Sequence, residues 1–147
     1  ITADRIGVAT LPDGAGTVRV IAGEHLGVRG PAKTFTPVTM LDIRLAGGGR
    51  AEFHVPARHN AALLVMKGKI AVNGEDASEN ELVVFANAGE HVAVEAGSDE
   101  GAQLLLLAGE PIDEPVVSYG PFVMNTEGEI RQAMVDFQDG KFGRLDD

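Results

Sequence analysis

The sequence contains no cysteine and no tryptophan among its 147 residues. Without cysteine the chain cannot build a disulfide framework or use a thiolate as a nucleophile or metal ligand. It has no uninterrupted apolar run of about 18 residues, the length that a membrane-spanning helix needs. These absences favour a cytoplasmic protein, and we expect no membrane partner.

The first residues, ITADRIGVATL, lack both the basic head and the apolar stretch of a signal peptide. The chain begins with isoleucine instead of methionine, so we expect it to be a processed or cleaved product. Its length and its 44% content of hydrophobic residues are sufficient for one domain with a substantial core.

Positive charge is scarce in the second half of the chain. Residues 1–69 carry nine Lys or Arg against five Asp or Glu, whereas residues 70–147 carry three against seventeen. No basic side chain lies between Lys69 and Arg131. An acidic segment of this kind repels phosphate and anionic lipid, so we expect no direct contact with nucleic acid.

Short apolar runs rich in Val, Ile and Leu recur along the chain, separated by Gly, Asn, Asp and Pro. This pattern predicts an all-β barrel or sandwich. The run LLLLAG is apolar on both faces, so we expect it to be buried between the barrel and something else. The pair Asn73 and Gly74 predicts a turn, and the acidic EDASENE that follows it predicts a longer loop. The expected strands are residues 18–22, 38–45, 51–55, 62–66, 70–72, 82–85, 92–94 and 104–108.

One C-terminal α-helix is indicated by a complete set of signals. Thr126 and Glu129 have the spacing of a capping box, in which each side chain bonds the other residue's backbone N–H. Gly140 is a plausible stop for the helix. The apolar stripe at helical spacing consists of Ile130, Ala133, Met134 and Phe137.

The segment before this helix, residues 109–125, reads as an irregular arm with several large apolar side chains. Leaving each of them in water would forgo roughly 1.5–3 kcal/mol, so the arm must dock on something. Aromatic and methionine side chains dominate interface cores. We therefore expect a domain interface at Tyr119, Phe122, Val123 and Met124, with docking on the chain's own barrel as the alternative.

Two stretches carry a family resemblance. GEPIDEPV, YGPFVMNT and the ending GKFG resemble the C-terminal end of the pirin family, and VRVIAGEHLGVRGPAKTFTPVTMLDIRL resembles the start of the second pirin cupin. The resemblance implies a cupin-like double-stranded β-helix, or jelly-roll barrel, over residues 17–109. It further implies that residues 1–16 are a linker from a missing upstream cupin and that residues 110–147 form the arm and helix.

Cupins bind metal through His-x-His and a following Glu in one motif and through a further His in a second motif. Two imidazoles spaced by one residue can reach one ion because alternate residues of a strand share a face. Counting from Gly48 places His54 and Pro56 at the two histidine positions and Ala61 at the glutamate position. The second motif places Val92 at its histidine position. Three of the four ligands are missing, and we expect no metal in this chain.

Three histidines offer a weaker alternative. A two- or three-histidine metal site built from His54, His59 and His91 stays open, because strand registers can bulge. Strand alternation nevertheless predicts that His91 points away from the face that its neighbour Val92 occupies. Nothing else in the sequence makes a catalytic set, so we assign no catalytic residue.

Three functions follow from this reading. In the first, the chain is the metal-free second cupin of a pirin-like bicupin, and it packs on and shapes an upstream cupin that holds iron. The resemblance implies that the parent is a quercetin 2,3-dioxygenase-like non-haem iron protein or a regulatory protein, with another protein as a further candidate partner. The alternatives are a free-standing metal-dependent cupin enzyme and a small-molecule binding module with its ligand in the barrel mouth.

Overall fold

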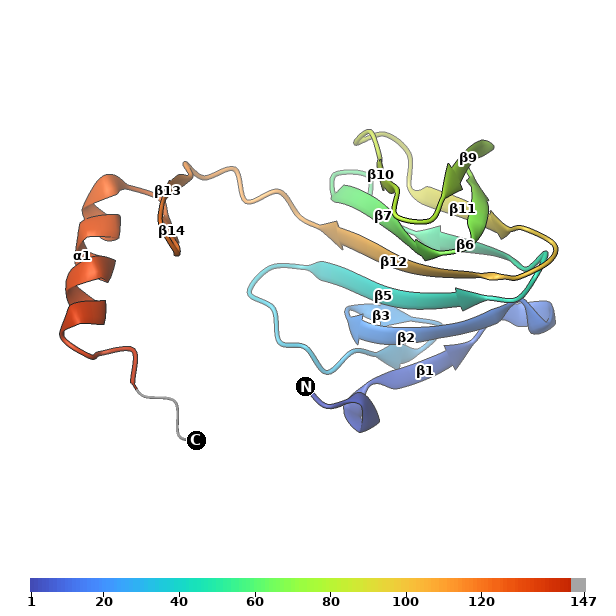
Figure 1. The fold of residues 1–147 in the computed structure, drawn as a ribbon, viewed down its shortest axis with the longest axis horizontal. Helices are drawn as coiled ribbons and strands as arrows, with labels where there is room; N and C mark the ends of the chain where they lie inside the picture. Colours follow the sequence, from blue (N-terminus) through green and yellow to red (C-terminus); the bar gives the residue numbers. More distant parts are fainter. Residues whose placement is uncertain (144–147) are drawn as a thin grey trace. The chain divides into compact units, whose positions relative to one another are not determined.

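The structure is a computed structural model that describes residues 1–143 (Figure 1). It contains two compact units, which divide between residues 111 and 112. We call residues 1–111 the barrel unit and the described residues from 112 onward the C-terminal unit. Within the described part of the chain, no helix is long and apolar enough to cross a membrane.

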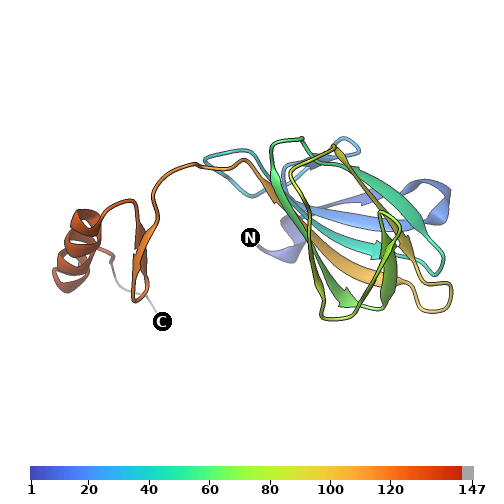
Figure 2. The ribbon, with the colours of Figure 1, turned by 90° about the horizontal axis from the view of Figure 1, so that it is seen from above.

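The barrel unit consists of two antiparallel sheets whose strands surround a common interior (Figure 2). The all-β, cupin-like fold predicted from the sequence is confirmed. The six-stranded sheet has the order β1 (Gly7–Thr10), β2 (Gly16–Ala22), β5 (Val38–Leu45), β12 (Ala102–Gly109), β7 (Asn60–Lys67) and β10 (Leu82–Val84). The four-stranded sheet has the order β6 (Arg50–His54), β11 (His91–Ala96), β8 (Lys69–Val72) and β9 (Glu75–Ser78).

The core of the barrel unit follows from the alternation of side chains along each strand. In β12, Leu104 and Leu106 are fully buried, whereas Leu105 and Leu107 point the other way and are half-buried. The run LLLLAG therefore fills the core with one face and presents leucines on the outer face of the six-stranded sheet. Phe53 on β6 is the largest of the fully buried core side chains.

The first part of the acidic segment after Gly74 is the strand β9, Glu75–Ser78, and not part of the long loop that we expected. Asn73 and Gly74 both have positive φ, at 49° and 87°, as a tight two-residue hairpin turn requires. The turn folds β9 back on β8, with Val72 opposite Glu75 and Ile70 opposite Ala77. Ala77 is buried and anchors β9, while the carboxylates beside it remain in water.

Part of the segment expected to be a linker belongs to the barrel unit. β1 pairs with β2, and Val8 lies opposite Arg19. Ala9 and Leu11 are each 4% exposed and join the core. Two short 3-10 helices, η1 (Ala3–Arg5) and η2 (Pro12–Gly14), flank this strand, and β3 (Glu24–His25) pairs with β4 (Val28–Arg29) as a small separate hairpin.

The C-terminal unit is more regular than the irregular arm that we expected. β13 (Val117–Tyr119) and β14 (Phe122–Met124) form a hairpin, and α1 (Glu127–Gln138) packs against both strands. The predicted capping box is present: the Glu129 N–H donates to Thr126 Oγ1 at 3.2 Å, and the Thr126 N–H donates to Glu129 Oε2 at 2.8 Å. Gly140, with φ of 73°, follows the end of the helix.

Candidate functional site

The barrel mouth, where a cupin would hold its metal, is lined by apolar side chains. On β6 the inward side chain is Phe53, which is 0% exposed, and Val55 continues this face at 6%. His54 and Pro56 are exposed. The frame counted from Gly48 is therefore wrong by one residue, because a bulky phenylalanine occupies the interior and strand alternation then turns His54 outward.

The two other predicted inward positions are confirmed. Ala61 is 8% exposed and Val92 is 3% exposed. Val92 lies directly opposite Phe53 in the pairing of β11 with β6. Val55, Ala61 and Val92 line one small hollow of about 200 Å³. None of the four inward residues at the mouth carries a nitrogen or oxygen in its side chain, so this position offers a metal ion no ligand.

The three candidate histidines do not assemble a site at the mouth. His54 and His91 face each other on β6 and β11, with ring centroids 5.8 Å apart, and both are exposed. As predicted, His91 faces away from buried Val92. His91 Nδ1 lies 2.9 Å from Glu52 Oε1 on the same outer face. His59 lies in the turn after β6, and both His59 and His91 help to line the hollow at the mouth.

Among residues 1–143 no group of three or more His, Asp or Glu side chains is arranged to hold a metal ion. The iron that the fold family implies therefore does not fit this chain. The buried mouth positions are apolar, and of the three candidate histidines only His59 and His91 border the hollow there, whereas His54 is exposed on the outer face.

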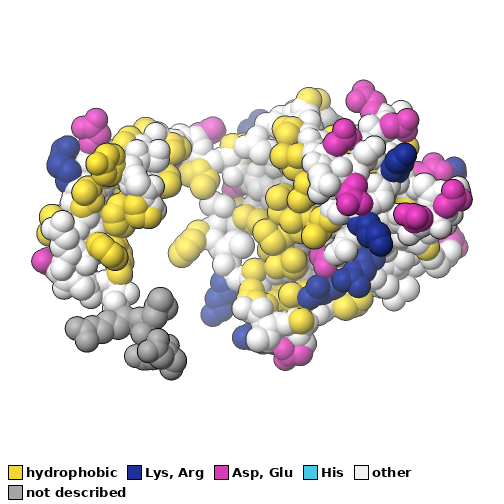
Figure 3. All heavy atoms as spheres, viewed as in Figure 1, with side chains coloured by type: hydrophobic (Ala, Val, Ile, Leu, Met, Phe, Trp, Pro, Cys, Tyr) yellow, Lys and Arg dark blue, Asp and Glu magenta, His cyan; other side chains and the backbone are white. Residues whose placement is uncertain are grey.

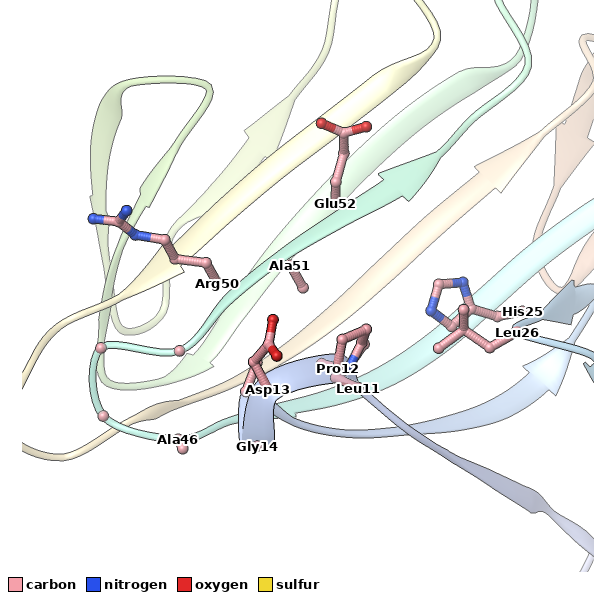
Figure 4. Close-up of a pocket in the computed structure, with 14 residues that line it drawn as sticks. Leu11, Pro12, Asp13, Gly14, His25, Leu26, Ala46, Arg50, Ala51 and Glu52 are labelled. Carbon is pink, nitrogen blue, oxygen red and sulfur yellow. The ribbon is translucent and has the colours of Figure 1, made fainter.

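A second hollow, of about 580 Å³, lies beside the outer edge of β6 and was not predicted (Figure 4). Its wall includes η2, the turn at residues 46–49 and His25 from the small hairpin. The His25 ring rests on Phe53, with ring centroids 5.2 Å apart. His25 and Phe53 are far apart in the sequence, and the fold alone brings their rings together.

The burial of His25 gives the barrel unit a testable dependence on pH. Burial lowers the pKa of His25 below its usual value, so the unfolded chain binds more protons than the folded one. Stability contributed by neutral His25 is present above about pH 6.5 and is lost as the pH falls through the lowered, folded-state pKa. His25→Phe keeps a ring against Phe53 and removes the titration.

We expect the urea midpoint of the wild type to fall more than that of His25→Phe between about pH 7.5 and about pH 5. His54→Phe removes an exposed histidine and is the matched control, which should leave the difference between the two pH values as in the wild type. If the urea midpoints of the wild type and of His25→Phe changed equally between these pH values, His25 would not contribute to the pH dependence of stability.

The predicted interface residues all belong to the C-terminal unit. Tyr119 is 64% and Val123 63% exposed, whereas Phe122 and Met124 are half-buried. Phe122 packs within its own unit, with ring centroids 6.4 Å from Phe137 and 6.2 Å from Phe142. Tyr119 and Val123 thus retain the most surface for a partner, and the role of all four residues in an interface stays a prediction.

Comparisons with known proteins agree with this geometry. Residues 40–143 match the model of the pirin C-terminal cupin domain. The chain belongs to the pirin family. It is 36% identical to human pirin over 130 residues, which cover 86% of the chain and 45% of human pirin. It is 41% identical over 134 residues to a Pseudomonas aeruginosa protein named as a candidate quercetin 2,3-dioxygenase, covering 91% of the chain and 46% of that protein.

A solved structure supports the same assignment. The crystal structure of a quercetin 2,3-dioxygenase from Acinetobacter baumannii superposes with a TM-score of 0.87 at 34% identity. The match covers 99% of this pirin chain and 50% of that one. The chain thus spans about half the length of the relatives that it matches, and it corresponds to their C-terminal cupin.

Proposed function

We propose that this chain is the metal-free second cupin of a pirin-like bicupin, and that it packs on and shapes an upstream cupin that holds non-haem iron. One observation carries the proposal. The mouth positions that would supply ligands are filled by Phe53, Val55, Ala61 and Val92, which are all buried and apolar. A cupin lined in this way keeps its fold without a metal at its mouth, and it acts in this proposal through the surface that it offers to another part of the protein.

In this proposal the work of the chain is structural. It stabilises the upstream half by covering part of its surface, and it limits which molecules reach the iron there. Iron in the upstream half would supply the oxygen or redox chemistry of the parent. We assign no catalytic residue to the chain. The names of its relatives are compatible with either an enzymatic or a regulatory parent protein.

Neither alternative function gains support from the site. A free-standing metalloenzyme would use His54 with His59 or His91, yet His54 is exposed on the outer face of its sheet, and no group of three or more possible ligands occurs among residues 1–143. A small molecule in the barrel mouth would have about 200 Å³ there, which is below the roughly 300–1,000 Å³ of typical ligand pockets.

Association of the two halves tests the proposal. We would produce this chain and the preceding half of the parent as separate polypeptides, mix them, and measure the molar mass by light scattering. The expected result is a one-to-one complex, because each half leaves an interface uncovered when it is alone. Two species that remain separate at all accessible concentrations would contradict the proposal.

A further inference from the structure

The outer face of the six-stranded sheet carries apolar side chains where a sheet facing water usually carries polar ones. The register fixes which of them are neighbours. Leu82 on β10 lies opposite Leu64 on β7, and Leu64 lies opposite Leu105 on β12. These three leucines form one continuous apolar row across three strands.

A second apolar row runs beside the first. Val84 lies opposite Ala62, Ala62 opposite Leu107, and Leu107 opposite Met40 on β5. Val84 is 72% exposed, and Met66, at the bulge near the end of β7, is 44% exposed. Figure 3 shows hydrophobic side chains gathered over these strands of the barrel unit. Contiguous apolar surface of this kind, as opposed to single scattered residues, marks an interaction site.

A polar row with two basic side chains borders the apolar rows. Lys67 on β7 lies opposite Gln103 on β12, and Gln103 lies opposite Arg44 on β5. In the described part of the chain, neither Lys67 nor Arg44 has an ion-pair partner. Lys and Arg side chains appear beside the hydrophobic area in Figure 3. This border is basic although the whole chain has a net charge of −10.

The acidic side chain that β5 carries on this face, Asp42, already has hydrogen-bond partners within the chain. Asp42 on β5 is 8% exposed, and it accepts hydrogen bonds from Arg19 at 3.1 Å and from Gln103 at 3.4 Å. Asp42 is therefore not free to pair with Lys67 or Arg44. Charge complementarity favours a partner that places acidic groups opposite Lys67 and Arg44.

We propose that this face is the docking surface for the upstream cupin half, and that the matching surface places carboxylates opposite Arg44 and Lys67. The inference rests on the proposed function, and it names the surface through which that function operates. The occupant follows from two facts. The relatives carry a further half that this chain lacks, and the face needs an apolar partner with an acidic border.

Methionine oxidation tests the location without any substitution. Met40 and Met66 both lie on this face, and oxidation by dilute hydrogen peroxide, read by mass spectrometry, reports how accessible each thioether is. We expect Met66 to oxidise several-fold more slowly when the upstream half is added, since burial in an interface excludes the oxidant. Met40, which is half-buried in the chain alone, should slow as well.

Charge reversal tests the basic border. Arg44→Glu combined with Lys67→Glu should weaken association on the order of ten-fold at low salt, with less effect at high salt. Arg58→Glu, which changes an exposed arginine in the loop after β6, is the matched control and should bind as the wild type does. Circular dichroism of each variant confirms that the sheet is retained.

The outcomes separate this inference from the proposed function. A complex that forms while Met66 oxidises at its original rate would overturn the docking surface and leave the bicupin role standing. The same conclusion holds if Met66 is equally protected in the chain alone, because the chain itself or a second copy then covers the face. Halves that never associate would overturn both proposals.

Discussion

Replacing Phe53 with alanine is expected to lower the free energy of unfolding of the barrel unit by about 3–5 kcal/mol. Phe53 is 0% exposed, and it occupies the interior where a metal-binding cupin would direct a ligand. Its removal leaves a cavity and takes away the surface on which the His25 ring rests. Urea denaturation followed by far-ultraviolet circular dichroism measures the change.

Phe35 provides the matched control for this substitution. It lies in the loop before β5 and is fully exposed. Phe35→Ala should change the free energy of unfolding by no more than about 0.5 kcal/mol. If Phe53→Ala were as mild as Phe35→Ala, the mouth would not be held by apolar packing, and our description of it would be wrong.

Val92→Asp should have an effect of similar size, about 3–5 kcal/mol, because it places an unpaired carboxylate in an apolar interior. Val92 is 3% exposed and lies opposite Phe53, so the new group finds no basic partner at its paired position. The same denaturation experiment measures the loss, and a second run near pH 4 should show part of it restored as the carboxyl group becomes neutral.

A substitution at the next residue of β11 tests whether the loss of stability depends on which face of the strand carries the carboxylate. Ala93→Asp introduces the same group at the next residue of β11, where the side chain is exposed. We expect it to cost less than about 1 kcal/mol. Equal losses at positions 92 and 93 would contradict the assignment of Val92 to the interior.

Much of the fold could be read from local patterns. The spacing of apolar runs predicted an all-β barrel unit, and the Thr126 and Glu129 pair predicted a helix start that the structure reproduces. Both signals are local: a strand needs only its own alternation, and a capping box needs only residues three apart. The acidic EDASENE misled us because its strand is anchored by one small residue, Ala77.

The site was harder to predict, since a period of two gives no indication of which face is inside. Counting from Gly48 put His54 and Pro56 inward, and the burial of Phe53 and Val55 reversed that choice. A one-residue shift moves every side chain of a strand to the other face. The bulk of Phe53, next to the polar His54, was the one signal that could have prevented the error.

The apolar rows on the outer face of the six-stranded sheet could not be predicted from the sequence for a different reason. LLLLAG showed that one strand was apolar on both sides, but the rows depend on pairings between residues far apart in sequence. Leu64 lies opposite Leu105, and Arg44 lies opposite Gln103. Such neighbours are set by strand order, which the sequence of one chain does not state.

Metal analysis of the purified chain, after exposure to iron, nickel or zinc and removal of excess ion, tests the central claim most directly. The account predicts far less than one ion per chain, and iron in the complex with the upstream half at one ion per complex. One tightly held ion per isolated chain, lost on substitution of His54, His59 or His91, would contradict it.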